Sequence, residues 1–315
     1  MKIKFLIVII SSLLIFSTCQ AQWDYGFDFS KAGSAGLQFL KIGIGAKECA
    51  LGEASLALSK GVNSIFWNPA GVAYVEKRAA TFSYSGWLLN MEHSACGAAI
   101  NLGKFGVMGV SVIYLGVPEF EETTVLQQAG TGRMVSANDL ALGLAYARRF
   151  TDKLSMGAQV RYVKEQLDQD SFSNVLMDIG AIYETGFRHL RIAVAAQHFG
   201  PDIKMLRDTF RMPLLFKLGL ADDIFHTDNN RLTLVVDLIH PTDNTERMSF
   251  GLEYGFFDWV FLRSGYRLNS DLGEWSFGGG LQQSLIGVEG SVDYSYTDFG
   301  EILGSVNRIS VSFNF

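Results

Sequence analysis

Apolar and polar residues alternate along the chain from Ala79 to the C-terminus, in segments of about ten residues. In one such segment the apolar side chains of Leu232, Leu234, Val236 and Leu238 share a face, and Asp237 lies on the opposite face. A period of two is the period of a β-strand, because successive side chains of a strand point to opposite faces. The pattern therefore predicts strands that are apolar on one side and polar on the other.

Fourteen segments show this pattern, which predicts about fourteen strands with boundaries uncertain by roughly two to four residues. They are Ala79–Leu89, Glu92–Gly103, Phe105–Leu115, Ala137–Phe150, Lys153–Leu167, Asn174–Thr185, Arg188–His198, Pro213–Phe225, Asn230–His240, Glu246–Phe256, Asp258–Asn269, Gly273–Ser284, Ile286–Thr297 and Val306–Phe315. An even number of antiparallel strands suits a closed transmembrane β-barrel with both termini on the periplasmic side. We therefore expect an all-β membrane protein with a barrel over residues 79–315.

The lengths of the connections agree with this interpretation. Periplasmic turns of such barrels are short and external loops are longer. The even-numbered connections are short, and three of the odd-numbered ones are longer: Gly116–Ser136, Phe199–Met212 and Asp298–Ser305. The first hairpin, at Asn90 and Met91, is an exception, since it is short and should be external.

The chain ends in an aromatic residue on an alternating strand, with Phe315 and Phe313 on its apolar face. Outer-membrane barrels commonly end in this way, and their assembly machinery recognises the final strand. A soluble β-sandwich could also end in Phe, so this signal depends on the strand pattern around it.

The N-terminus has the features of a secretory signal peptide. Lys2 and Lys4 precede an apolar stretch, and small residues before Ala21 predict cleavage after that residue. The expected signal peptide is therefore 1–21. A lipoprotein with Cys19 as the modified residue is the alternative.

Residues 22–78 differ from the predicted strands in composition and in the spacing of their apolar residues. Ala46 to Ser59 is rich in Ala and Leu at helical spacing, which predicts a short helix ending before Gly61. Asn68–Gly71 (Asn-Pro-Ala-Gly) predicts a tight turn, because Pro presets φ and Gly tolerates a positive φ. We expect this segment to fill the lumen as a plug, since fourteen unplugged strands would enclose an open pore. A periplasmic extension beside the barrel is the alternative.

Composition changes this picture little. The 33 Gly, 24 Phe and 11 Tyr suit many short strands with tight turns. A net charge of −6 gives no reason to expect nucleic-acid binding. Cys49 and Cys96 would remain after cleavage, and their pairing is left open.

Candidate chemistry is sparse. His93 and Ser94 could suggest a His-activated nucleophile, but adjacent strand residues point to opposite faces. We found no catalytic or phosphate-binding motif and no metal-ligand pattern. The sequence predicts neither an enzyme nor a cofactor.

Alternation turns a set of charged and polar side chains toward the lumen. They are Gln159, Arg161, Lys217, Asp237, Glu253, Arg263, Glu289, Asp293 and Arg308. Mixed signs favour mutual pairing, and pairing with plug groups such as Lys47, Glu48 and Glu53, over a polar path for a solute.

Two external loops carry apolar residues among charges and are candidate contact surfaces for a protein or lipid. Their apolar residues are Phe120 in the first and Ile203, Met205, Leu206 and Phe210 in the second. The alternative is that these loops fold over the barrel mouth and bury those side chains.

Two motifs carry a resemblance to a known family. Gly45–Ala54 contains Gly45, Ala46, Leu51 and Gly52, and Ile65–Gly71 ends in Asn68, Pro69, Ala70 and Gly71. Together they resemble the N-terminal signature of the PorV/PorQ family, within the wider group of FadL-like fourteen-stranded barrels. The resemblance implies a plugged outer-membrane barrel that helps type IX secretion in Bacteroidota. PorV-type members bind the C-terminal signal domains of exported proteins, although this chain is compact for such a shuttle.

The leading hypothesis is a non-enzymatic outer-membrane protein of type IX secretion or cargo attachment. Its expected partners are outer-membrane lipid, the barrel assembly machinery, and secreted cargo or secretion-system subunits. The alternative is a FadL-like transporter of a hydrophobic ligand, which predicts an apolar pocket between plug and wall near Asn68, Pro69 and Ala70.

Overall fold

The computed structural model describes residues 33–315 except 206, 207, 271 and 286. The predicted signal peptide, residues 22–32 of the predicted plug, and Leu206 lie outside the described residues.

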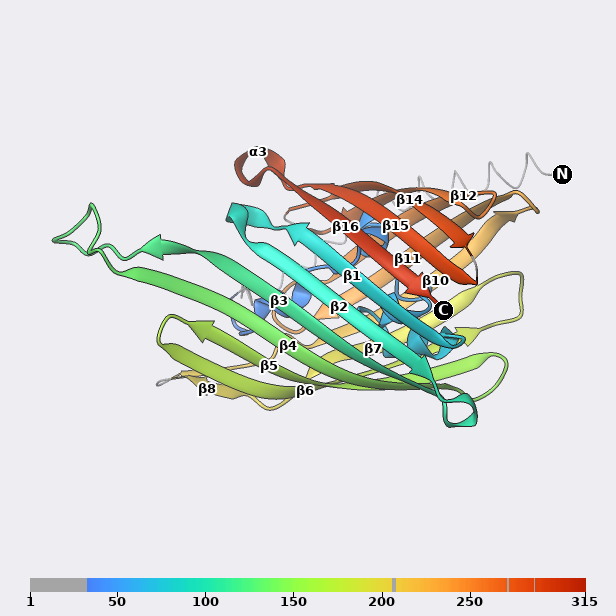
Figure 1. Cartoon of the computed structure of the whole chain (residues 1–315), viewed down its shortest axis with the longest axis horizontal. Helices are drawn as coiled ribbons and strands as arrows, with labels where there is room; N and C mark the ends of the chain where they lie inside the picture. Colours follow the sequence, from blue (N-terminus) through green and yellow to red (C-terminus); the bar gives the residue numbers. More distant parts are fainter. Residues whose placement is uncertain (1–32, 206–207, 271, 286) are drawn as a thin grey trace, which may run out of the picture. The chain divides into compact units, whose positions relative to one another are not determined.

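Within the described residues, fourteen antiparallel strands form a closed barrel in which β1 pairs with β16 (Figure 1). This confirms the barrel predicted from the alternating pattern. The strands are β1 (Arg78–Gly86), β2 (Glu92–Asn101), β3 (Val107–Glu121), β4 (Met134–Arg149), β5 (Leu154–Leu167), β6 (Asp170–Glu184), β7 (Arg191–Phe199), β10 (Leu215–His226), β11 (Asn230–Pro241), β12 (Arg247–Phe256), β13 (Val260–Leu268), β14 (Trp275–Leu285), β15 (Val288–Asp298) and β16 (Ser305–Asn314).

The barrel has two ends that differ in their connections. At the terminal rim, where β1 begins and β16 ends, the connections are short, as between β2 and β3. At the far rim, β3 and β4 continue past Val117 as a long hairpin that projects beyond the others (Figure 1). A short two-stranded sheet, β8 (Ile203–Met205) with β9 (Asp208–Phe210), lies in the far-rim connection between β7 and β10.

Inward and outward side chains alternate as the sequence predicts. In β16, Arg308 and Ser310 are buried in the lumen, whereas Ile309 and Phe313 are exposed on the outer surface. Apolar outward side chains recur around the wall, as a lipid-facing surface requires.

One stretch of the wall departs from regular pairing. β7 has 9 residues and β6 has 15, and their register shifts between Met177 and Ile179. The backbone N–H of His198 donates instead to a carboxylate oxygen of Asp178 at 2.7 Å, and His198 has a positive φ of 63°. The first residues of β6, Asp170 to Leu176, therefore have no partner on β7.

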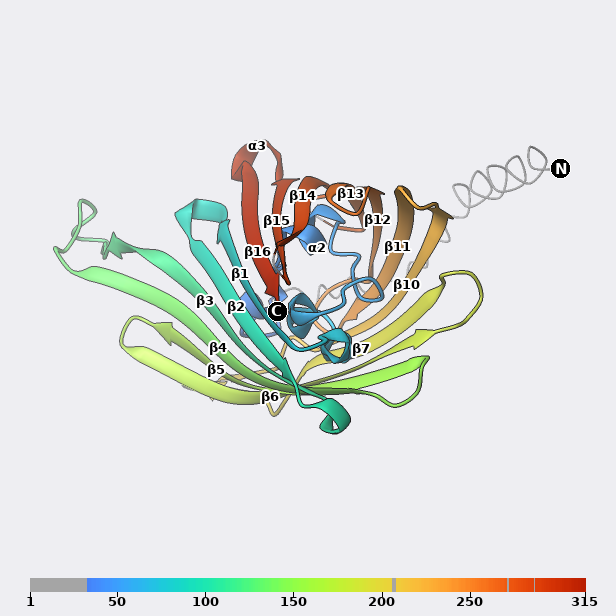
Figure 2. The same cartoon turned by 45° about the vertical axis from the view of Figure 1, so that its right-hand side comes forward.

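The segment before β1 lies inside the barrel (Figure 2). Its elements are η1 (Gln38–Lys41), α2 (Ala46–Ala50), η2 (Val62–Phe66) and η3 (Pro69–Tyr74). α2 contacts β13–β16, η2 contacts β1–β3, and η3 contacts β3–β6. The segment thus touches opposite sides of the wall, and we call residues 33–77 the lumen segment.

The helix predicted over Ala46–Ser59 is mostly wrong, because α2 ends at Ala50. Gly52 and Glu53 both have positive φ values, 66° and 67°, and cannot continue a right-handed helix. Close packing against the wall favours this break. Gly52 lies so near the backbone of Gly265 and Tyr266 in β13 that a Cβ at this position would collide with it.

The remaining short helices are η4 (Leu88–Asn90), η5 (Gly103–Phe105) and α3 (Gly300–Leu303). Among the described residues, no helix is long and apolar enough to cross a membrane.

Candidate functional site: the filled lumen and the far rim

The Asn68 turn is held in the lumen by its own side chain. Asn68 is fully buried and caps η3, because its amide oxygen accepts from the backbone N–H of Ala70 at 3.1 Å. Its amide nitrogen donates to the carbonyls of Leu56 and of Ala181 in β6, each at 3.4 Å. One side chain therefore joins two parts of the lumen segment to the wall.

Glycines in the wall make this approach possible. A Cβ on Gly157 in β5 would lie 2.5 Å from the carbonyl carbon of Pro69, and a Cβ on Gly180 in β6 would collide with the Asn68 amide. Gly278, in the triple-glycine run of β14, allows the Ala50 side chain to approach in the same way. The run therefore lets the lumen segment approach the wall.

The first turn of α2 bridges the first and last strands. The backbone N–H of Gly45 donates to the Ser83 hydroxyl of β1 at 3.3 Å, and that of Ala46 donates to the Ser310 hydroxyl of β16 at 2.6 Å. Ser83 and Ser310 are directly opposite each other in the β1–β16 ladder. Both strands of the barrel seam are thus attached to the same helical turn.

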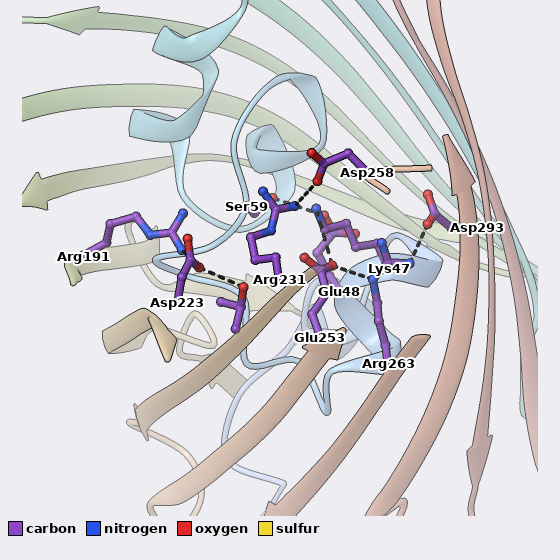
Figure 3. A network of polar contacts seen from close by, with 11 residues as sticks. Lys47, Glu48, Ser59, Arg191, Asp223, Arg231, Glu253, Asp258, Arg263 and Asp293 are labelled. Carbon is purple, nitrogen blue, oxygen red and sulfur yellow. Dashed lines mark hydrogen bonds and ion pairs between the residues drawn. The ribbon is translucent and has the colours of Figure 1, made fainter. Parts of the chain in front are cut away.

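A buried ion network lies between α2 and the wall of β12, β13 and β15 (Figure 3). Arg263 donates to Glu253 at 2.7 Å and to Asp293 at 2.6 Å. Lys47 of α2 lies 3.8 Å from the same Glu253 carboxylate. Two carboxylates therefore face two cations, which satisfies charges that would be costly to bury alone.

Glu48 of α2 is less well satisfied. One carboxylate oxygen accepts from the Ser59 hydroxyl at 3.1 Å, and the other is buried without a hydrogen-bond partner. Burial raises the pKa of Glu48, and nearby Lys47 opposes this shift only in part. Glu48 borders a polar cavity of about 210 Å³ between the lumen segment and β13–β16.

A second buried cluster lies at the irregular β6–β7 pairing. Arg161 in β5 forms an ion pair with Asp178 at 2.8 Å, and its guanidinium also lies 3.4 Å from the His198 ring. Asp178 was not among the predicted lumen residues, although alternation within its predicted strand places it inward. Arg267 was not among them either, and it pairs with Glu53 of the lumen segment at 3.0 Å.

The other lumen-facing residues mostly contact the lumen segment or each other. Asp237 accepts from the backbone N–H groups of Ser55 and Leu56, each at 2.9 Å, and Lys217 lies over the Trp67 ring at 5.1 Å. Gln159 donates to Ser111, Arg308 donates to Thr297, and Glu289 accepts from Gln282 and Asn314. These contacts support mutual pairing rather than an open polar path.

The far rim exposes apolar side chains at the tips of its hairpins. Phe120 is 54% exposed on the projecting β3–β4 hairpin, and Val125 and Leu126 at its tip are 90% and 95% exposed. Leu89 in η4 and Ile302 in α3 are 77% and 97% exposed. Phe120 was predicted as a contact residue and the other four were not. Leu89 and Ile302 lie outside the two loops that were selected, and the other two lie within the first loop.

The second predicted contact loop folds inward instead. Ile203 is buried in the core cluster, Phe210 is half-buried, and the carbonyl of Arg211 accepts from the backbone N–H of Gly36. Ile203 therefore does not lie on a free surface, as the alternative interpretation of this loop anticipated. Met205 lies at the end of β8.

The two cysteines face different environments. Cys49 is buried in the lumen segment, where burial raises its pKa to about 12, and Cys96 is exposed on the outer face of β2. They are free thiols rather than a disulfide. His93 is buried, and Ser94 points to the other side of the wall. In the described part of the chain, no three His, Cys, Asp or Glu side chains form a group that could hold a metal.

An apolar hollow lies on the outside of the wall. It measures about 910 Å³, and its lining includes outward side chains of β4–β11, among them Tyr146, Ile179, Val194, Phe216 and Leu238. The Asn68 turn packs on the opposite side of the same wall, against Gly157 and Gly180. This hollow therefore differs from the apolar pocket between plug and wall that the transporter hypothesis predicted.

The fold and the filled lumen define an outer-membrane β-barrel of the FadL-like type. A FadL homologue of Pseudomonas aeruginosa matches with a TM-score of 0.59 and 12% identity, over 87% of this chain and 99% of that one. The toluene transporter TodX of Pseudomonas putida matches with a TM-score of 0.59 and 13% identity, over 87% and 98%. The CymD monoaromatic hydrocarbon channel gives 0.56 and 13%, over 86% and 96%. At such low identity these similarities establish the fold alone.

The family to which the chain belongs is shown by a comparison of its sequence with family models. The family model described as "Type IX secretion system protein PorV" matches residues 27–244, which include both N-terminal motifs. The chain belongs to the PorV family of type IX secretion system proteins, as the resemblance of those motifs suggested. A comparison with curated proteins found no significant match.

Proposed function

We propose that this chain is a non-enzymatic outer-membrane component of type IX secretion that binds a protein partner through its far rim. Membership of the PorV family supports the secretion role. The observation that carries the binding role is the projecting β3–β4 hairpin, whose tip residues Val125 and Leu126 are almost fully exposed. Aliphatic side chains at the tip of a projecting hairpin suit a contact with a partner.

In this proposal, the terminal rim faces the periplasm and the far rim faces outward. Short connections at the terminal rim and the longest hairpin at the far rim support this orientation. The lumen segment acts as a plug, supported by its contacts with strands on opposite sides of the wall. Phe313 and Phe315, both exposed on the outer face, serve as the assembly signal.

Partner recovery from the outer membrane tests the binding role. The double variant Val125→Asp/Leu126→Asp, and separately Phe120→Asp, should fold normally and lose the secretion-system protein that co-purifies with the unchanged chain. Gln128→Asp is the matched control, because it adds charge to the same exposed hairpin without removing an apolar side chain. Equal recovery of the partner from all of these variants would contradict the proposal.

A further inference from the structure

A pocket of about 290 Å³ lies at the far rim, between the lumen segment and the loops that join the strands. The lumen segment contributes Lys41, Ile42 and Glu53 to its lining. The wall and loops contribute Arg247 at the start of β12, Arg267 near the end of β13, and the rings of Trp87 and Phe299, among others. The pocket thus combines three cationic side chains, one carboxylate and two aromatic rings.

Most of the charges around this pocket are already paired. Lys41 contacts both carboxylate oxygens of Asp243 at 2.6 Å, and Arg267 pairs with Glu53 at 3.0 Å. Arg247 differs, because its side chain makes no hydrogen bond or ion pair with the described residues. Its Nε is buried without a partner, although the side chain as a whole is half-buried. A guanidinium held in this way lacks an acceptor.

The side chains that line the pocket carry an excess of positive charge, because Lys41, Arg247 and Arg267 outnumber the single carboxylate of Glu53. Burial alone would raise the pKa of Glu53, but Arg267, Arg247, Arg308 and Lys217 outweigh it and lower the pKa. An anion entering the pocket would therefore meet a cationic excess, even though the whole chain carries a charge of −6.

The two rings fix the cations around the pocket. Trp87 and Phe299 pack edge to face with centroids 5.5 Å apart, Arg308 lies over Trp87 at 5.3 Å, and Arg267 lies over Phe299 at 5.7 Å. Stacking leaves the N–H edges of a guanidinium in the plane of the group, where Arg267 donates to the carbonyl of Gly273 and to Glu53.

The surroundings favour a peptide over a membrane lipid. Lys41, Ile42 and Glu53 of the lumen segment line the pocket, so it lies within the barrel mouth, whereas a lipid headgroup in the leaflet would meet the outer face. Leu89 and Ile302 lie two and three residues beyond Trp87 and Phe299, on the tips of neighbouring hairpins. A peptide that fills the pocket and also contacts Leu89 and Ile302 would thus carry a carboxylate beside apolar side chains.

We propose that this far-rim pocket binds a carboxylate of an acidic, partly apolar peptide segment of the partner, with Arg247 as the bidentate donor. This inference deepens the proposed function and rests on it, since the far rim must be the partner-binding end. It assigns to the partner a charge opposite to that of the pocket.

The test measures binding of a short rhodamine-labelled peptide of alternating leucine and glutamate, amidated at its C-terminus, to the detergent-solubilised full chain. Fluorescence anisotropy should show binding that weakens about tenfold or more, a loss of about 1.4 kcal/mol, when glutamine replaces glutamate in the peptide. Equal binding of both peptides would overturn the proposal, and this comparison requires no variant protein.

Variants locate the site. Arg247→Gln should lose binding of the acidic peptide by about tenfold, and Arg247→Lys should lose less, because it keeps the charge but not the guanidinium fork. Arg188→Gln is the control, since it removes the same charge from an exposed residue at the terminal rim. Binding that is unchanged in Arg247→Gln, or lost equally in Arg188→Gln, would contradict the assignment.

Three further outcomes separate the alternatives. Displacement of the peptide by inorganic phosphate, at concentrations where acetate has no effect, would identify a phosphate site instead and overturn the carboxylate assignment. If the unchanged chain and Arg247→Gln recover the secretion partner equally, the pocket proposal fails while the proposed function stands. If the unchanged chain recovers no partner, the proposed function itself fails.

Discussion

Glu48 shows at the residue scale how a buried carboxylate can oppose folding near neutral pH. Its unpartnered oxygen is buried beside the polar cavity, and burial raises its pKa. A group whose pKa is higher in the folded state contributes stability that is fully present below its unfolded pKa. That contribution is lost as the pH rises through the folded value.

Glu48→Gln should therefore stabilise the barrel at pH 8, on the order of 1–3 kcal/mol, and should make little difference below the ordinary value of 4.5. Urea unfolding in detergent across this pH range measures the effect. Glu76→Gln is the control, because Glu76 is exposed just before β1. A gain for Glu48→Gln that does not depend on pH would contradict the explanation.

The charged residues of the lumen also show what can be predicted from the sequence: the direction of a side chain, but not its partner. Alternation predicts that Glu253, Arg263 and Asp293 point inward, and they do. It does not predict which of them meet, because partners depend on the register between strands. Glu253 and Arg263 are opposite each other in the β12–β13 ladder, while Asp293 reaches Arg263 across the glycines of β14.

At the element scale, the alternating pattern predicted all fourteen barrel strands but not their defects. At the irregular pairing of the short β7, Asp178 accepts from the backbone N–H of His198 and pairs with Arg161 of another strand. The early end of α2 depends on contact between Gly52 and β13. Such features come from tertiary contacts, to which local periodicity is insensitive.

The unpaired edge of β6 is covered by the segment before β10. The Asn174 amide donates to the carbonyl of Pro201 at 2.8 Å, and its oxygen accepts from the backbone N–H of Val175 at 2.8 Å. A side chain thus replaces the strand partner that β7 does not supply, and it protects an edge that would otherwise be open.

Hydrogen exchange should reveal this weaker stretch of wall. We expect amides in 170–176 to exchange faster than those in 156–162 of β5, which pairs on both sides. Asn174→Ala should accelerate exchange in 170–176 further, and Ser173→Ala should not. Mass spectrometry of peptides from the detergent-solubilised chain measures both, and uniform protection along β6 would contradict this account.

At the scale of the whole molecule, the lumen segment connects strands that the wall alone joins only through their neighbours. Asp237 in β11 binds the backbone of Ser55, and Ala46 binds Ser310 in β16. Stability of the barrel and placement of this segment should therefore be coupled.

Ser310→Val should lower the temperature at which the barrel unfolds in gel-mobility assays. The substitution leaves the buried N–H of Ala46 without its acceptor, at a cost of about 1–3 kcal/mol. Ser291→Val is the matched control, an inward serine on β15 that borders the polar cavity. An equal shift for both variants would point to a general packing effect.

The attachment of the α2 turn to both Ser83 and Ser310 also sets an order for biogenesis. The two hydrogen bonds of the α2 turn end on the first and the last strand. Docking of α2 can therefore be complete only once these two strands have met. An assembly intermediate with an open seam would still expose the two hydroxyls, and the arrival of the final strand would join the two ends of the chain across a single turn of backbone.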